Sequence, residues 1–165
     1  MEMIAIMDRN NALGAGENQI VKIKEDLRHF LALTRGHIVI YGRKTLASLP
    51  TPQGLPHREN WILTRSSLKI PGIRSLSSLS EALQAIQNAE REGKKVLICG
   101  GGEVYRQFLP YADVLHLTIV DAVFPEADVF FPEISGAWKL EKEEGPFIAE
   151  EPPHYSYTFC TYQKK

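Results

Sequence analysis

Short apolar runs alternate with longer amphipathic segments through the first two-thirds of the chain. Apolar runs bounded by glycine, proline or polar clusters predict strands, whereas apolar positions that recur every three or four residues predict helices. The expected strands are Met3–Met7, His37–Tyr41, Asn60–Thr64, Lys94–Cys99, Val114–Asp121, Trp138–Glu143 and His154–Tyr162. The expected helices are Lys24–Thr34, Arg43–Leu49, a segment from Ser78 to about Arg91, and Glu103–Leu109.

Local signals support several of these boundaries. Ser78 and Glu81 have the spacing of a capping box at the start of the third helix. Gly36 follows the first helix, while Pro50 and Pro110 follow the second and the fourth. The segment Asp8–Asn18 carries three asparagines and two glycines, and we expect it to be a long polar loop.

The order of these elements predicts an α/β fold. Strands that alternate with helices favour a mostly parallel sheet covered on both faces, and the strand-rich ending adds an antiparallel strand at the C-terminal edge. Ligands of such sheets bind at the carboxyl ends of the strands. The loops that leave Met7, Tyr41, Thr64 and Cys99 are therefore the places to look for a site.

Composition narrows the function classes. The 165 residues suit one domain. With 19 basic and 20 acidic residues, the chain lacks the excess of positive charge that is typical of proteins that bind nucleic acids or anionic membranes. No apolar run approaches the ~20 residues of a membrane span, and no basic signal region precedes the first strand, so we expect a cytoplasmic protein. Cys99 and Cys160 favour free thiols in a reducing compartment, and no Cys/His spacing suits a metal site.

Three glycines, Gly100–Gly102, connect a predicted buried strand to the helix that starts at Glu103. Glycine permits positive φ and close ligand approach, and a helix start presents free N–H groups to an anion. A Rossmann fingerprint would need glycine where this chain has Tyr105. The turn is therefore either a phosphate-binding turn of another kind or a tight turn without a ligand.

A second strand–glycine–helix junction reads Gly42-Arg43-Lys44-Thr45. It lacks the glycines of a P-loop, which excludes that motif. Two cations at a helix start oppose the helix dipole, and a bound phosphate would remove this conflict, with Thr45 as a further donor. Together with Arg65, they would suit a phosphomonoester such as the 2′-phosphate of NADPH. A solvated basic first turn is the alternative.

Asp26 and Arg58 are the candidates for substrate contacts. Asp26 lies in the first turn of the first helix beside Leu27, where an acid also simply stabilises the helix start. Its other possible role is to face a pocket lined by Leu27 and Phe30 and to hydrogen-bond a heterocyclic amidine through both oxygens. Arg58 is either a surface residue or a clamp for a substrate carboxylate.

In combination, these segments resemble the dihydrofolate reductase family over essentially the whole chain. The matching segments are Ile4–Asp8, Ala12–Gly14, Glu25–Leu27 with Phe30, Ile38–Thr45, Leu55–Pro56, Arg58–Asn60, Ile98–Tyr105, Gln107–Pro110, Leu117–Thr118, and Asp128 with Phe130–Pro132. The resemblance implies one domain over residues 1–165, with about eight strands in the central sheet. It also implies reduction of 7,8-dihydrofolate to tetrahydrofolate by hydride transfer from NADPH.

The resemblance further implies residue roles. Asp26 would hold the pterin ring and assist protonation of its nitrogen, with Thr118 in the same network, and Gly100-Gly101 would be a cis peptide. The implied substrate residues are Ile4, Ala5, Leu27, Phe30, Leu49 and Arg58. The implied cofactor residues are Ile6, Leu13, Gly14, Gly42, Arg43, Lys44, Thr45, Leu63, Thr64, Arg65, Cys99, Gly100, Gly101, Gly102, Glu103, Val104 and Tyr105.

One loop departs from the family pattern. The family usually has a hydrophobic residue, proline and tryptophan before the acid, where this chain has Gln19, Ile20 and Val21, and Lys24 replaces a frequent proline. The missing indole N–H removes a donor that orders water near the pterin, which affects loop closure, turnover and antifolate binding more than the fold. His29 is also unusual beside the pocket helix.

Two alternatives stay open at this point. One is a reductase of the riboflavin-pathway type that acts on another heterocycle, and the other is a non-catalytic protein that binds NADPH or a pterin. The first is disfavoured by Arg58 and by the pocket of Leu27 and Phe30, and the second by the retention of Asp26, Thr118 and Arg58. Nothing in the sequence requires a dimer, so we expect a monomer.

Overall fold

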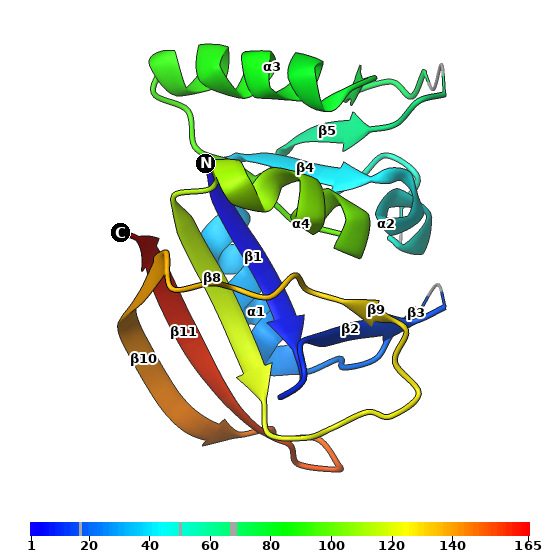
Figure 1. Cartoon of the computed structure of the whole chain (residues 1–165). Helices are drawn as coiled ribbons and strands as arrows, with labels where there is room; N and C mark the ends of the chain where they lie inside the picture. The colour runs from blue at the N-terminus through cyan, green and yellow to red at the C-terminus, as the bar shows by residue number, and fades with distance from the viewer. Residues whose placement is uncertain (17, 50, 67–68) are drawn as a thin grey trace.

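An eight-stranded sheet runs through the centre of the molecule (Figure 1). The computed structural model describes every residue except 17, 50, 67 and 68. The strand order is β10-β11-β8-β1-β7-β4-β5-β6. The strands are β1 (Glu2–Met7), β4 (Ile38–Gly42), β5 (Glu59–Leu63), β6 (Ile73–Leu76), β7 (Val96–Ile98), β8 (Val114–Val120), β10 (Trp138–Ile148) and β11 (Ser156–Lys164).

The sheet is mainly parallel, as predicted. All pairings from β8 across to β6 are parallel, whereas β11 pairs antiparallel with β8 and β10 antiparallel with β11. The C-terminal edge therefore carries the expected antiparallel pairing. It is a long hairpin, in which β10 is the outermost strand and β11 lies between β10 and β8.

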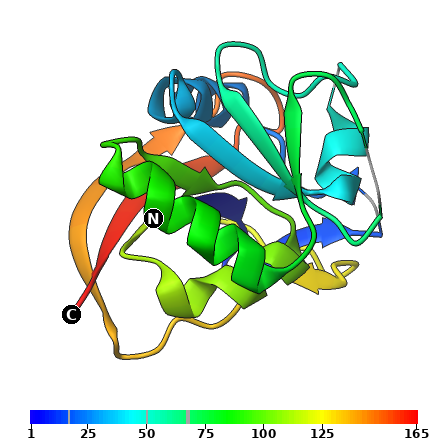
Figure 2. The same cartoon turned by 90° about the horizontal axis from the view of Figure 1, so that it is seen from above.

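Helices cover both faces of the sheet, which confirms the predicted fold class (Figures 1 and 2). They are α1 (Lys24–Thr34), α2 (Arg43–Ser48), α3 (Leu79–Arg91) and α4 (Gly102–Phe108), followed by the 3-10 turn η1 (Leu109–Tyr111). On one face, α3 and α4 bury apolar side chains such as Ile86 and Phe108 in the main core with Ile40 and Ile98. The other face carries α1 and α2, because Asp26 of α1 meets Thr118 there and Leu46 of α2 packs on Val39, Tyr41 and Ile62.

The structure corrects the prediction of a long polar loop over Asp8–Asn18, because short strands lie in this segment. This segment contains β2 (Ala12–Ala15) and the start of β3 (Asn18–Gln19), and together with β9 (Val129–Phe130) they form a separate sheet of order β3-β2-β9. The Asp8 carboxylate accepts bonds from the N–H groups of Asn10 and Ala12 at 2.8 and 2.9 Å. These bonds fold the turn that connects β1 to β2.

Smaller differences concern one further strand and the ends of some elements. Strand β6 was not predicted, because only two residues of its Ile-Arg-Ser-Leu sequence are apolar. Strand β10 continues five residues past Glu143. The prediction ended it too early because its edge position leaves nearly all its side chains exposed, so no apolar pattern marks its full length. Pro110 lies inside η1 instead of directly after the helix, and the predicted stop at Pro50 lies outside the described residues.

Cys99 and Cys160 are both free thiols, as the sequence favoured. Within the described parts of the chain, no helix combines the length and the apolar character needed to cross a membrane.

Candidate active site

Asp26 meets the sheet from the first turn of α1. The Thr118 hydroxyl, on β8, donates a hydrogen bond of 2.6 Å to Oδ1 of Asp26. Burial raises the pKa of the Asp26 carboxyl from its ordinary 3.8 to about 6, while the bond from Thr118 lowers it. A carboxyl with such a pKa can take up and release a proton close to neutral pH, which an acid–base group requires. Asp26 and Thr118 are thus joined, as the resemblance implied.

An apolar surface continues from Asp26 along α1. Leu27 is 55% exposed, and Phe30 is half-buried one turn further on. Thr34 is the buried residue of α1, so the helix does not bury a continuous apolar face in the core. An exposed apolar surface beside a desolvated carboxyl suits a flat ring with polar edges.

The other predicted substrate residues divide between the two faces of the sheet. Ile4 is buried on β1, and its carbonyl accepts a bond of 2.6 Å from the Tyr105 hydroxyl. Leu49 packs against the cluster of Val39 and Tyr41 on the α2 side. The Ala5 side chain lies in the main core under α3 and α4, because successive strand residues point to opposite faces. The Ala5 side chain is therefore not brought together with Asp26.

Arg58 is fixed at the C-terminal end of α1. Its Nε donates to the Thr34 hydroxyl at 2.9 Å, and its Nη2 and Nη1 donate to the carbonyls of Leu31 and Pro56, both at 2.6 Å. Burial lowers the pKa of Arg58, and the nearby charge of Arg35 lowers it further. A guanidinium has five N–H groups, so two remain beyond these three bonds. The arrangement holds the guanidinium in one orientation with two N–H groups left over.

The two glycine turns lie side by side. The Gly42 N–H donates to the Gly100 carbonyl at 2.9 Å. A Cβ built on Gly101 would stand 3.7 Å from the Thr45 hydroxyl, and one on Gly42 would stand 3.2 Å from the Val104 side chain. The Gly100-Gly101 peptide is cis, which confirms that expectation. The junctions that begin α2 and α4 thus form one backbone-lined surface with a hydroxyl beside it.

The hairpin of β2 and β3 borders the same surface. A Cβ on Gly102 would lie 2.7 Å from the Val129 side chain and 3.9 Å from the Leu13 side chain. A Cβ on Gly14 would lie 2.7 Å from the carbonyl of Asn18, so glycine is required for the hairpin to close. Leu13, Gly14 and Gly102 are therefore brought together, as a shared cofactor site needs.

The remaining residues of the predicted cofactor site have varied surroundings. Val104 and Tyr105 are buried in the main core, and Cys99 packs with the cluster around Val39. Ile6 and Leu63 are half-buried at the ends of β1 and β5. The Glu103 carboxylate is exposed and pairs with Arg106. Burial raises the pKa of the Cys99 thiol, so it is an inert apolar group here.

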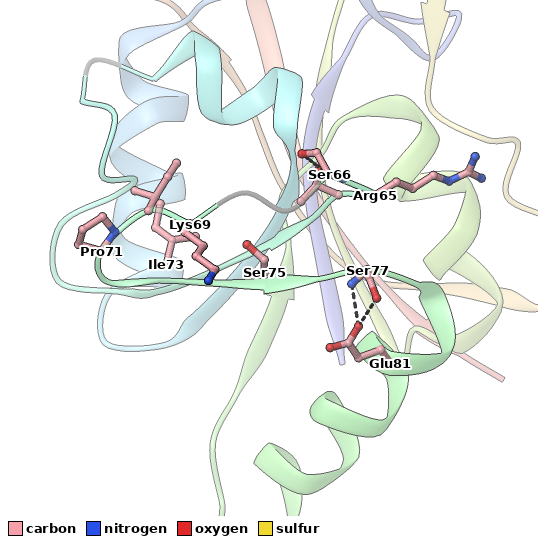
Figure 3. A pocket seen from close by; sticks show the side chains of 10 residues that line it. Arg65, Ser66, Lys69, Pro71, Ile73, Ser75, Ser77 and Glu81 are labelled. Carbon is pink, nitrogen blue, oxygen red and sulfur yellow. Dashed lines mark hydrogen bonds between the residues drawn. The ribbon is translucent and has the colours of Figure 1, made fainter.

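The predicted cation cluster is assembled in part. Arg43 donates to the Ser66 hydroxyl at 3.3 Å, and that hydroxyl is 3.0 Å from the Thr64 hydroxyl. Ser66 also lines a cavity of about 630 Å³, and Figure 3 draws the side chains around it. It is lined by Thr64, Arg65, Ser66, Lys69, Ile70, Pro71, Ile73, Ser75, Ser77 and Glu81. The Arg65 side chain points away from Lys69 in this view, and Lys44 is exposed on the first turn of α2.

Sequence reasoning missed Lys69 and Ser66 in this region. Their position in the sequence could have indicated them, because Ser66 and Lys69 follow the carboxyl end of a predicted strand, where ligands of such sheets bind. Among the described residues, His, Cys, Asp and Glu side chains form no group that could hold a metal ion.

The atypical loop is anchored against the C-terminal hairpin. Val21, at the usual place of the tryptophan, is 2% exposed and packs with Ile23, Val120, Ala149 and Tyr157, and Ile20 borders this cluster. The Glu25 carboxylate accepts a bond of 2.9 Å from the N–H of Glu150 at the hairpin tip. The segment before Asp26 is therefore held by a small apolar core instead of by an indole.

Comparison with known proteins gives a consistent result. The sequence model described as dihydrofolate reductase matches residues 1–164. The chain is 34% identical to the dihydrofolate reductase of Bacillus subtilis, in an alignment that covers all of this chain and 95% of the relative. It is 33% identical to dihydrofolate reductase type 3 of Salmonella typhimurium, in an alignment that covers all of this chain and 98% of that protein. A solved structure of dihydrofolate reductase from Enterococcus faecalis, complexed with NADP(H) and RAB-propyl, superposes with a TM-score of 0.85 at 25% identity. That alignment covers 99% of this chain and 95% of the other.

Proposed function

The chain belongs to the dihydrofolate reductase family, and from this premise we propose that it reduces 7,8-dihydrofolate to 5,6,7,8-tetrahydrofolate with NADPH. The observation that carries the proposal is the desolvated Asp26 carboxyl, hydrogen-bonded to Thr118 beside the apolar surface of Leu27 and Phe30. It combines an acid–base group with a surface for a flat heterocycle.

Asp26 is the acid–base residue of the proposed site. As a carboxylate it accepts two N–H donors from the amidine edge of the pterin, which fixes the ring in one orientation. Its pKa of about 6 lets it share a proton with the ring at neutral pH, which assists protonation of the ring nitrogen. Thr118 keeps the carboxyl in place by its donated bond.

The substrate tail fits the other end of α1. Leu27, Phe30, Leu49 and Ile4 would contact the aromatic parts of the folate, and the backbone of Ala5 would border the ring. Arg58 would bind the glutamate carboxylate with the N–H groups that its three internal bonds leave free. A heterocycle without a carboxylate tail would leave this fixed cation unused, which favours dihydrofolate over the substrate of a riboflavin-pathway reductase.

The residues of the two glycine turns fit NADPH. Gly42, Gly100, Gly101 and Gly102 allow close backbone approach, and the Thr45 hydroxyl stands beside Gly101. Arg43, Lys44, Thr64 and Arg65 would hold phosphate groups, and Ile6, Leu13, Gly14, Leu63, Cys99, Glu103, Val104 and Tyr105 would complete the surface. When bound, NADPH supplies the hydride, while this chain supplies position and charge.

One copy of the chain would contain the whole site. Asp26, Thr118, Arg58 and both glycine turns all come from the same 165 residues, so a monomer of one domain suffices. Two free thiols agree with a reducing compartment such as the cytoplasm. In this role the protein would supply tetrahydrofolate for one-carbon metabolism and would be a target of antifolates.

The test is oxidation of NADPH, followed by the absorbance of the reduced nicotinamide, with and without dihydrofolate. Oxidation that requires dihydrofolate is the expected result. Asp26→Asn should depress turnover by at least tenfold at neutral pH and leave NADPH affinity nearly intact. Tight binding of NADPH without turnover in the wild-type protein would instead favour a non-catalytic binding protein, and equal loss of turnover and NADPH affinity in the variant would make Asp26 structural.

A further inference from the structure

His29 lies on α1 one turn after Asp26, and the proposed reaction gives it no role. Its imidazole stacks on the ring of Phe159 in β11, with ring centroids 3.9 Å apart and an interplanar angle of 17°. Phe159 is the register partner of Thr118 across the antiparallel pairing of β11 and β8. The ring under His29 is therefore the direct neighbour of the residue that bonds Asp26.

We propose that His29 is a positioning residue for Asp26, whose stack on Phe159 fixes the rotation of α1 over the sheet so that the carboxyl meets Thr118. This inference rests on the proposed function. A single contact on one turn leaves a helix free to rotate about that contact, whereas contacts on two successive turns define its orientation. Asp26 and His29 supply such contacts to the sheet on successive turns, in addition to the bond of Glu25 with Glu150 and to the bonds of Arg58 at the C-terminal end of α1.

Helix α1 depends on such contacts because it has little core packing. Thr34, near its C-terminal end, is its buried residue, and Leu27 is exposed. At the N-terminal end, Glu25 accepts the N–H of Glu150, which adds a polar contact but no apolar one. The stack of His29 is thus the aromatic contact that holds the middle of the helix to β11.

The surroundings of His29 favour its neutral form. The titratable and charged groups on the elements around it include Glu25, Asp26 and Arg28 on α1, His116 on β8, Glu2 on β1 with Lys95 next to it, and Glu144 with Lys142 on β10. The His116 Nε2 atom is 2.6 Å from a Glu2 oxygen. Burial lowers the pKa of His29, the neighbouring His116 lowers it further, and Glu144 opposes them. Acidification would therefore place an imidazolium in a half-buried stack beside a second histidine.

The experiment is a pH titration of the Asp26 carboxyl and the histidine rings by nuclear magnetic resonance, in the full chain without substrate or cofactor. In His29→Ala, water reaches the carboxyl, so its pKa should fall from about 6 toward the ordinary 3.8. His29→Phe keeps an aromatic stack and should retain the wild-type value. Phe147→Leu is the matched control, since Phe147 packs on Phe159 at 5.7 Å from β10 and not from α1, and it should also retain that value.

A double-mutant cycle then tests whether the two rings act as a unit. Phe159→Leu should lower the Asp26 pKa as His29→Ala does, and the two together should lower it no more than either alone. In turnover assays the KM for dihydrofolate should rise more steeply on acidification in the wild-type enzyme than in His29→Phe, because Asp26 takes up a proton in both proteins and His29 only in the wild type.

Three results would overturn the proposal: an unchanged Asp26 pKa in a folded His29→Ala variant, an equal fall in Phe147→Leu, or additive effects in the cycle. Circular dichroism establishes that each variant is folded. The titration requires no turnover, so its failure is distinguishable from failure of dihydrofolate-dependent NADPH oxidation.

Discussion

At the scale of single residues, the chemistry of the site is set by what surrounds one carboxyl. Burial pushes the pKa of Asp26 upward and the Thr118 hydroxyl pulls it downward, and the outcome of about 6 lies near physiological pH. The protonated fraction of Asp26 therefore grows as the pH falls through 6. A reaction that needs a proton at the substrate ring should accelerate over the same range.

Thr118→Val removes the bond that favours the ionised form of Asp26. The pKa of the carboxyl should then rise above 6, and the pH profile of turnover should shift to higher pH with it. Thr118→Ser, which keeps the hydroxyl, is the control and should retain the wild-type profile. The profile is measured by steady-state NADPH oxidation across the pH range. A profile of Thr118→Val that coincides with the wild type would mean that this bond does not tune Asp26.

The sequence predicted which residues belong to the site better than it predicted what surrounds their side chains. Asp26, Thr118 and Arg58 were named from the sequence because their types and spacing resemble a family, and they occupy geometries that suit the roles expected of them. The core placement of the Ala5 side chain and the stack of His29 on Phe159 depend on strand register. Register pairs Ala5 with Leu117, 112 positions further along the chain, and a local pattern does not contain it.

At the scale of elements, the cofactor surface arises where two strand–turn–helix units meet. Gly100 has φ of +121°, a conformation that side-chain-bearing residues rarely adopt, whereas Gly101 has an ordinary φ of −89°. Neighbouring glycines therefore serve different purposes. The first permits the path of the chain, and the second leaves room beside Thr45.

This difference predicts different outcomes for two alanine substitutions. Gly100→Ala should destabilise the fold by about 1–3 kcal/mol, because it forces a strained backbone conformation. Gly101→Ala places its methyl group in ordinary contact with Thr45 and should change stability by less than about 1 kcal/mol, yet weaken NADPH binding at least tenfold by occupying the ligand surface. Urea unfolding and fluorescence titration with NADPH measure the two effects. Unchanged NADPH affinity in Gly101→Ala would remove this turn from the cofactor site.

The start of α2 predicts the choice between NADPH and NADH. Replacing Arg43 and Lys44 by alanine should weaken NADPH about tenfold for each cation lost and leave NADH nearly unaffected, which erases the preference. Replacement of Arg91 and Lys139 is the control for net charge, since both are exposed and lie away from the carboxyl ends of the strands. The ratio of kcat/KM for the two cofactors is the measurement. A surviving preference would place the phosphate contact elsewhere, for example around Lys69.

Elements with strong local signals were predicted closely. Helix α1 has its predicted bounds, and α3 begins after Ser78, which accepts the Glu81 N–H as a capping box predicts. Strands β2, β3, β6 and β9 were missed because they are only two to four residues long, and the exposed edge strand β10 was predicted too short. Such strands owe their existence to hydrogen bonds with distant partners, so apolar periodicity does not report them.

At the scale of the whole molecule, the two faces of the sheet contribute differently. The face under α3 and α4 holds the main apolar core, which includes Ile86, Phe108 and Ile98. The face under α1 holds Asp26 and Thr118, a polar pair in a place where apolar packing would stabilise more. The site is therefore maintained at the expense of stability, and the stability of the core face compensates for it.

Asp26→Asn should accordingly stabilise the fold at neutral pH while it depresses turnover. The pKa of Asp26 is raised from 3.8 to about 6, so the folded state binds this proton more tightly than the unfolded chain, and stability falls as pH rises between these values. Two pKa units correspond to about 3 kcal/mol, which is an upper bound for a partly solvated group. The free energy of unfolding of the variant should therefore exceed that of the wild type by about 1–3 kcal/mol above pH 6, and the difference should vanish toward pH 4. Urea unfolding at several pH values measures the difference. Asp121→Asn, at an exposed pair with Arg9, should change stability by less than about 1 kcal/mol, and a wild-type protein as stable as Asp26→Asn at neutral pH would show that the carboxyl is not desolvated.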